Sequence, residues 1–280
     1  MRKVSGGFGR GIALFLVLLF TFSPAYAAAR SLAAAQSEFD AGNFASAAVL
    51  ARKLRTAKGD ALASRAEAVR GEFMAEGEER LRRFQIALAD GRRALSRDPA
   101  LPEAHLAIAV ALGLVARSEG GVKAHFEGLG TQARAHIGKA LALDEGNAWA
   151  HAALGGWHLE IVYEGGLLGA AVYGASFAAG IAAYERALEL DPGNVSIAWQ
   201  YAFQLSGFDG VENRARAAEL LADMLARPPG DALEEILCRS AEHLQQALEK
   251  NDKAEAARIV SEGLGRRAPP ASPASRNRTR

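Results

Sequence analysis

The sequence has little of what builds a disulfide-bonded, metal-binding or nucleic-acid-binding protein. Its one cysteine, Cys238, excludes a disulfide framework and any metal site with several cysteine ligands. The net charge is only +1, and the basic residues gather at the two ends of the chain, so the body between them is mildly acidic. Such a body does not present the basic surface that nucleic-acid binding needs. Aromatic residues make up only 7%, which argues against an all-β protein.

What the chain has in abundance is alanine, about a fifth of its 280 residues. Half of all residues are hydrophobic, which supplies enough apolar side chain for a core and excludes a fully disordered chain. Alanine is the best helix former, and its small side chain lets helices approach closely. The composition therefore predicts an all-α protein.

Residues 1–27 are typical of a secretory signal peptide. Three basic residues precede an apolar run over residues 12–22, and Ala25 and Ala27 form a small-x-small cleavage pattern. The run is shorter than the roughly 20 residues of a membrane span. We therefore expect a periplasmic or secreted protein cleaved near Ala27, with an uncleaved inner-membrane anchor as the alternative.

Three stretches of the body repeat one another. Residues 91–99, 137–145 and 184–192 each read as the end of a helix followed by a stop, because proline or a Gly-Asn pair cannot continue it. A new apolar helix follows each stop, beginning near Ala104, Trp149 and Ile197. This alternation predicts an array of helix-turn-helix units.

The array resembles the tetratricopeptide repeat, a helix-turn-helix unit of usually 34 residues. In that family small residues stand where the helices of one unit cross. The matching positions here are Ala35, Ala47, Ala75, Ala87, Ala94, Ala109, Ala133, Ala140, Gly155, Gly180, Ala187, Ala202 and Ala217. The resemblance implies a right-handed α-solenoid of about five to six repeats over residues 28–266. The long central units also look similar to bacterial relatives of the regulator-of-microtubule-dynamics family.

The spacing departs from the tetratricopeptide pattern in the middle of the chain. Ala94 and Ala140 are 46 residues apart, and Ala140 and Ala187 are 47 apart. The additional residues fall within the units, over 117–128 and 163–176. The second insertion is apolar and rich in glycine, so two interpretations stay open: a lid over a ligand cavity, or an extended second helix packed against its neighbour.

A helical solenoid binds partners along its concave face, which the first helix of each unit lines. The repeat register places Trp149, Glu160, Trp199 and Phe203 there, and we take these four as the candidate partner-binding residues. Large aromatic residues are favoured as binding anchors. The alternative is that the aromatic side chains belong to the core between repeats. By the same register, Glu103, Leu106, Val110, Gly156 and Ser196 also face the concave side.

The sequence contains no paired catalytic carboxylates, phosphate loop, nucleophile motif or metal-ligand set. His105, His151 and His158 fill repeat positions and read as packing residues. We therefore expect a non-enzymatic adaptor, without cofactor or metal, that binds a protein or peptide and no nucleic acid. The alternative function is an accessory protein of an envelope transport system that binds a small apolar ligand.

Residues 267–280 form a tail rich in proline, serine and arginine, with no acidic residue. Such a segment cannot bury a core, so we expect it to be disordered. Its positive charge would allow at most a weak contact with an anionic membrane surface.

Overall fold

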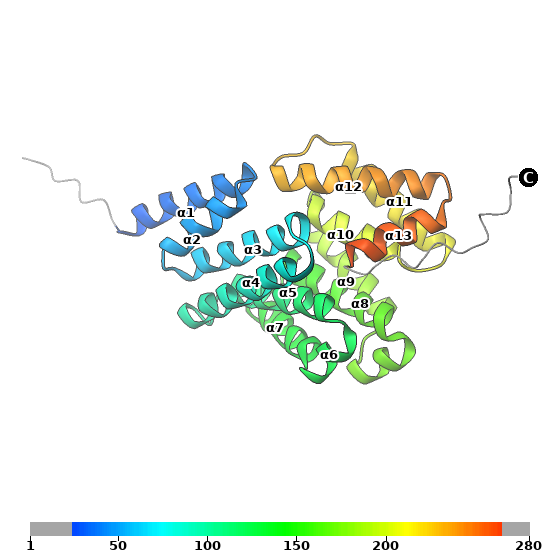
Figure 1. Cartoon of the computed structure of the whole chain (residues 1–280), viewed down its shortest axis with the longest axis horizontal. Helices are drawn as coiled ribbons and strands as arrows, with labels where there is room; N and C mark the ends of the chain where they lie inside the picture. The colour runs from blue at the N-terminus through cyan, green and yellow to red at the C-terminus, as the bar shows by residue number, and fades with distance from the viewer. Residues whose placement is uncertain (1–23, 265–280) are drawn as a thin grey trace, which may run out of the picture.

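The computed structural model describes residues 24–264, and all regular structure in this range is helical (Figure 1). The helices are α1 (Pro24–Asp40), α2 (Phe44–Lys53), α3 (Ala57–Met74), α4 (Gly77–Arg97), α5 (Pro102–Glu119), α6 (Gly121–Phe126), α7 (Leu129–Leu143), α8 (Ala148–Tyr173), α9 (Phe177–Leu190), α10 (Val195–Leu205), α11 (Val211–Leu225), α12 (Ala232–Glu249) and α13 (Lys253–Gly263). Residues 1–23 of the expected signal peptide and the whole of the expected tail, 267–280, lie outside the described residues.

Within residues 24–264 the helices form six consecutive helix-turn-helix pairs. The pairs are α1–α2, α3–α4, α5–α7, α8–α9, α10–α11 and α12–α13, with the short α6 inserted in the third. The first helices of successive pairs contact one another along the stack. This arrangement confirms the predicted α-solenoid of helical repeats.

The repeated stop motifs end and restart helices as the sequence predicted. Asp98, Asp144 and Asp191 follow the last residues of α4, α7 and α9. Asn147 and Asn194 then cap α8 and α10, because each side-chain oxygen accepts a hydrogen bond of 3.0 Å from a backbone N–H three residues later. The boundaries before α8 and α10 are therefore encoded locally.

Small residues allow the helices of a pair to cross closely. A Cβ added at Gly155 would lie 2.5 Å from the ring of Tyr184, and one added at Gly180 would lie 2.6 Å from Leu159. One predicted crossing position is wrong: Ala75 is only half-buried, at the C-terminal end of α3. Gly71 takes this role instead, because a Cβ there would lie 2.4 Å from Phe84.

The two central insertions pack against each other. The first contains α6, and the second continues α8 past a kink at Gly166, where φ is 55°. The hydroxyl of Tyr173 and Nδ1 of His125 lie 2.7 Å apart and join the two insertions. The second insertion thus lengthens the first helix of its pair, rather than the second helix as one interpretation expected.

No single helix among residues 24–264 is long and apolar enough to cross a membrane. Helices α8 and α9 reach that length and composition only together, and they bend by 98° between them.

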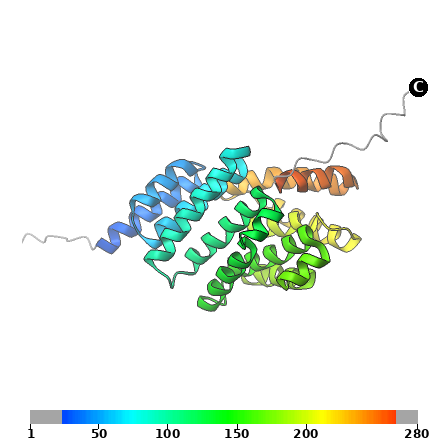
Figure 2. The ribbon, with the colours of Figure 1, turned by 60° about the horizontal axis from the view of Figure 1, so that its bottom comes forward.

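The first and last pairs of the solenoid approach each other. α1 contacts α12, and a Cβ added to Gly42, in the turn after α1, would lie 3.0 Å from Cβ of Ala232. In Figures 1 and 2, α12 begins next to the pair of α1 and α2 rather than at the far end of an open array. The curvature of the stack therefore places the inner helices around a common concave space.

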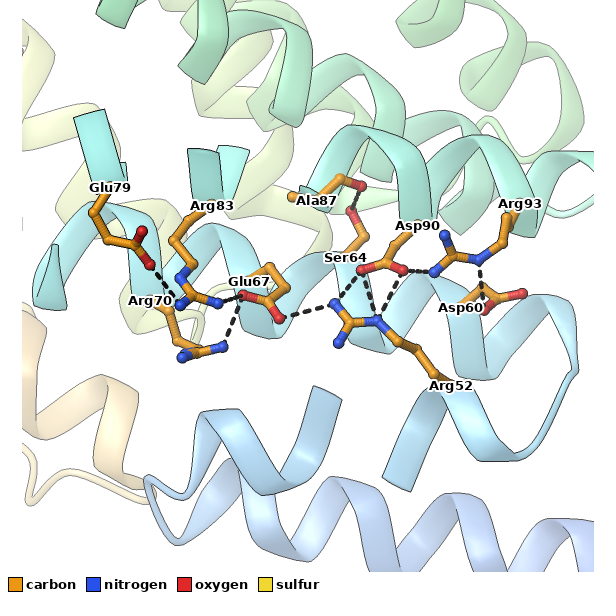
Figure 3. A network of polar contacts seen from close by, with 10 residues as sticks. All are labelled: Arg52, Asp60, Ser64, Glu67, Arg70, Glu79, Arg83, Ala87, Asp90 and Arg93. Atoms are coloured by element: carbon orange, nitrogen blue, oxygen red, sulfur yellow. Dashed lines mark hydrogen bonds and ion pairs between the residues drawn. The ribbon is translucent and has the colours of Figure 1, made fainter. Parts of the chain in front are cut away.

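A network of buried charges holds the second pair to α2 (Figure 3). Asp60, Glu67 and Asp90 are at most 2% exposed, although carboxylates are rarely buried unless paired. Arg52 on α2 bridges Glu67 on α3, at 2.8 Å, and Asp90 on α4, at 2.6 Å. Further arginines complete the network: Arg70, Arg83, Arg93 and Arg97.

Candidate functional site: the concave groove

The concave side of the solenoid holds a groove with a volume of about 1190 Å³. The first helices α1, α3, α5, α8, α10 and α12 line it, together with one side of α13 and Arg80 of α4. The register assignment of the first helices to the concave side therefore matches the position of the groove. A space of this size takes a peptide segment or a ligand of several hundred cubic ångströms.

Three of the four predicted partner-binding residues line this groove. Trp149 on α8 is 42% exposed and available to a partner, whereas Trp199 on α10 is 8% exposed and belongs mainly to the core. Phe203 is half-buried, and its ring centroid lies 5.5 Å from that of Trp199. On α5, Val110 is 48% exposed in the same groove, with Leu106 beside it. Trp149 and Val110, with Phe73 and Met74 at the end of α3, are thus the exposed large apolar side chains of the groove.

The fourth predicted residue, Glu160, lies behind the groove surface. Its two carboxylate oxygens each accept a 3.0 Å hydrogen bond from Arg117, which does line the groove. Arg117 also lies 3.4 Å from Glu72 on α3, and these two carboxylates raise the pKa of its guanidinium above its ordinary value despite burial. The structure therefore gives Glu160 a partner within the chain.

Amide and hydroxyl groups add polar contacts to the groove. Gln204 lines it and accepts a 3.1 Å hydrogen bond from the hydroxyl of Tyr184. Tyr184 stacks on Tyr201 with ring centroids 4.7 Å apart, and burial raises the pKa of the Tyr184 hydroxyl. A tyrosine held protonated in this way donates a fixed hydrogen bond, and it orients the amide of Gln204 at the groove.

The α3 wall of the groove was missed by the sequence analysis. Lys58 and Arg65 both line the groove from α3, are exposed, and stand seven residues apart, so they lie on one face of the helix. The guanidinium of Arg65 lies 4.5 Å from the ring centroid of Phe39 and 5.7 Å from that of Trp149. Extending the repeat register from α5 back to α3 would have found them.

The predicted packing histidines have partners in the chain. Nδ1 of His105 lies 3.0 Å from Nδ1 of His136, and Nε2 lies 3.2 Å from the carbonyl oxygen of Pro99. His151 contacts the carbonyl oxygen of Glu145, and His158 accepts a hydrogen bond from the backbone of Ser176. Among residues 24–264, no group of three or more His, Cys, Asp or Glu side chains is arranged to hold a metal ion.

Six helix-turn-helix pairs around a concave groove define a tetratricopeptide-type α-solenoid. The family model for regulator of microtubule dynamics protein 1-3 matches residues 31–202, more than half of the chain, and the chain belongs to this family. The fold is also similar to that of a thermophilic tetratricopeptide-repeat protein from Thermus thermophilus, with a TM-score of 0.54 and 16% sequence identity. That similarity covers 77% of this chain and 98% of the other. No curated protein matches the sequence.

Proposed function

We propose that this protein is a non-enzymatic adaptor that binds a protein or peptide partner in its concave groove, and that it does so in the bacterial envelope after export. The observation that carries the proposal is the exposure of Trp149 and Val110, at 42% and 48%, on the floor of a groove of about 1190 Å³. Exposed apolar surface inside a concavity is typical of a site that a partner covers.

The fold class agrees with this proposal, because helical-repeat solenoids use their extended concave surfaces for recognition. The groove also offers polar groups beside the apolar ones, including the amides of Gln200 and Gln204. A mixture of aromatic anchors and polar groups is typical of protein interfaces.

The test is affinity capture with two matched variants. Val110→Glu places a charge in the groove, and Val49→Glu places the same charge on α2 outside it, at a side chain that is 49% exposed. Purified chain spanning residues 28–280 is cross-linked in native envelope extract, and the captured proteins are identified by mass spectrometry. We expect one partner with wild type and Val49→Glu and its loss with Val110→Glu. Capture that is equal for all three chains would contradict a groove site.

Export has its own test. The cells are fractionated by osmotic shock, and the N-terminus of the recovered protein is sequenced. We expect recovery from the periplasmic fraction with a mature chain that begins at Ala28, within the first turns of α1. Recovery from the cytosol with an intact N-terminus would contradict export.

The alternative, a small apolar ligand in the groove, is favoured only by the cavity volume. The glycine-rich insertion does not line the groove, so it does not act as its lid in this structure. A thermal-shift screen against apolar ligands distinguishes the two functions, because a ligand that binds only the native state raises Tm.

A further inference from the structure

The groove contains two cations that no group in the described chain neutralises at contact distance. The other arginines of the groove are paired: Arg80 and Arg117 with Glu72, and Arg258 with Glu255 and Glu262. Within residues 24–264, neither Lys58 nor Arg65 forms a hydrogen bond or an ion pair; Arg65 makes only the two aromatic contacts described above.

The protein around Arg65 disfavours the charged form of its guanidinium. The guanidinium is exposed to the groove, yet the protein around it removes enough water to lower its pKa. Two carboxylates, Asp231 and Asp40, raise the pKa of Arg65 in part, although both lie too far away to form an ion pair with it. Both are already engaged, since Asp231 caps α12 and Asp40 accepts a hydrogen bond from Gln36. The guanidinium therefore keeps donors that have no acceptor among residues 24–264.

The guanidinium of Arg65 lies over two aromatic rings, which accept no N–H hydrogen bonds in its plane, so its N–H donors are left for a ligand. Phe39 is fully buried and fixed, and Trp149 is an exposed aromatic residue of the groove. Stacking on aromatic rings orients a guanidinium and lowers the entropy that it loses when it binds a carboxylate. Lys58, two helical turns away on the same face, adds a second positive charge about 10 Å along the groove.

We propose that Arg65, supported by Lys58, is an anion subsite in this groove, and that the partner is an acidic peptide segment whose Asp or Glu side chain binds there while neighbouring apolar residues cover Trp149 and Val110. This inference rests on the proposed function of the groove. The groove lining continues along α3 past Arg65 in both directions, to Lys58 on one side and to Glu72 on the other, where Glu76 follows at the start of α4. An Asp or Glu side chain within a partner segment that runs along the groove therefore fits the position of Arg65 better than the C-terminus of a partner chain.

The test is selection of random 12-residue peptides, displayed with free flanking sequence, against the whole chain and its variants. We expect wild type to enrich peptides that combine Asp or Glu with aromatic or branched apolar residues. Arg65→Glu reverses the preference toward Lys and Arg, and Arg65→Gln removes it. The control is Arg82→Glu, the same charge reversal at an exposed side chain outside the groove. Each variant is first checked for wild-type Tm and helicity.

Selected peptides are then synthesised with amidated C-termini, and their affinities are measured. We expect binding to wild type to be at least about tenfold tighter than to Arg65→Gln, as a charge-assisted hydrogen bond allows, and to weaken with salt. If amidated peptides no longer bind, the subsite binds the C-terminal carboxylate of a peptide and not an Asp or Glu side chain, and the proposal is wrong. Equal acidic enrichment with Arg65→Glu would overturn the subsite while leaving the groove intact. Binding that survives Val110→Glu would overturn the groove itself.

Discussion

The guanidinium of Arg117 and the carboxylate of Glu160 form a two-point contact, Nε to Oε1 and Nη2 to Oε2, each over 3.0 Å. Such a fork-to-fork pair is both strong and geometrically specific. It joins α5 to α8 at the back of the groove, and Arg117 extends the connection to Glu72 on α3. Three neighbouring repeats are therefore fixed to one another where the partner site is proposed.

A double-mutant cycle measures this contact. Arg117→Met and Glu160→Gln each destabilise the fold, but together they cost less than the sum, with a coupling of about 2 kcal/mol. Urea unfolding followed by circular dichroism gives the four free energies of unfolding. Additive values would mean that the pair contributes nothing to stability.

The buried network of Figure 3 makes α2 dependent on one arginine. Arg52→Ala removes the bridge between the buried carboxylates of Glu67 and Asp90. Other arginines still pair with both carboxylates, so we expect the loss of charged hydrogen bonds rather than an unpaired charge, about 1.5–3 kcal/mol. Arg82→Ala is the control, because its side chain is 74% exposed and a surface pair contributes about 1 kcal/mol or less. Similar losses for both variants would contradict the network.

Two glycine-to-alanine substitutions test the close crossing of the helices. Gly155→Ala forces a methyl group against Tyr184 and the carbonyl oxygen of Gly180, and we expect a cost of about 1–3 kcal/mol. Gly113, inside α5, has no atom within 4 Å of an added Cβ, so Gly113→Ala raises stability by up to about 1 kcal/mol. Opposite changes in Tm are the expected result, and a stabilising Gly155→Ala would refute the close crossing.

The two groove tryptophans have different roles, which truncation separates. Trp199 is 8% exposed, so Trp199→Ala opens a cavity and lowers stability by about 3–5 kcal/mol. Trp149→Ala removes a side chain that is 42% exposed, and we expect a small change in Tm together with loss of partner binding. Calorimetry and the capture assay measure the two effects. A large stability loss at Trp149 would make it a core residue.

The histidine pair between α5 and α7 gives the fold a dependence on pH. Burial, with His105 and Arg92 nearby, lowers the pKa of His136. The unfolded chain therefore binds this proton more readily than the native one, and stability present above about pH 6.5 is lost as the pH falls below it. We expect a smaller loss between pH 7 and 5 in His136→Asn, with exposed His243→Asn as the unchanged control. Equal pH dependence in all three proteins would contradict this.

The architecture could be predicted because the repeat signals are local. These signals are the Asp-Pro and Gly-Asn stops, the asparagine caps and the small residues at helix crossings. Each acts within one unit, so it can be recognised in the sequence without knowledge of tertiary contacts. Only Ala75 was assigned to a crossing that Gly71 makes. The site was less predictable, because the register places Glu160 on the concave side but does not reveal that Arg117, 43 residues away, binds its carboxylate. The contact between α1 and α12 could not be predicted either, because it depends on the summed rotations between six successive pairs.

The central claim, that the groove is the binding face, is tested most directly in living cells. A photo-cross-linking amino acid is placed at position 110 on the groove floor and, in a second chain, at position 49 on α2, two sites of nearly equal exposure. The account predicts a discrete adduct with one protein from position 110, and none from position 49. Adducts from position 49 alone, or the same adduct from both positions, would contradict it.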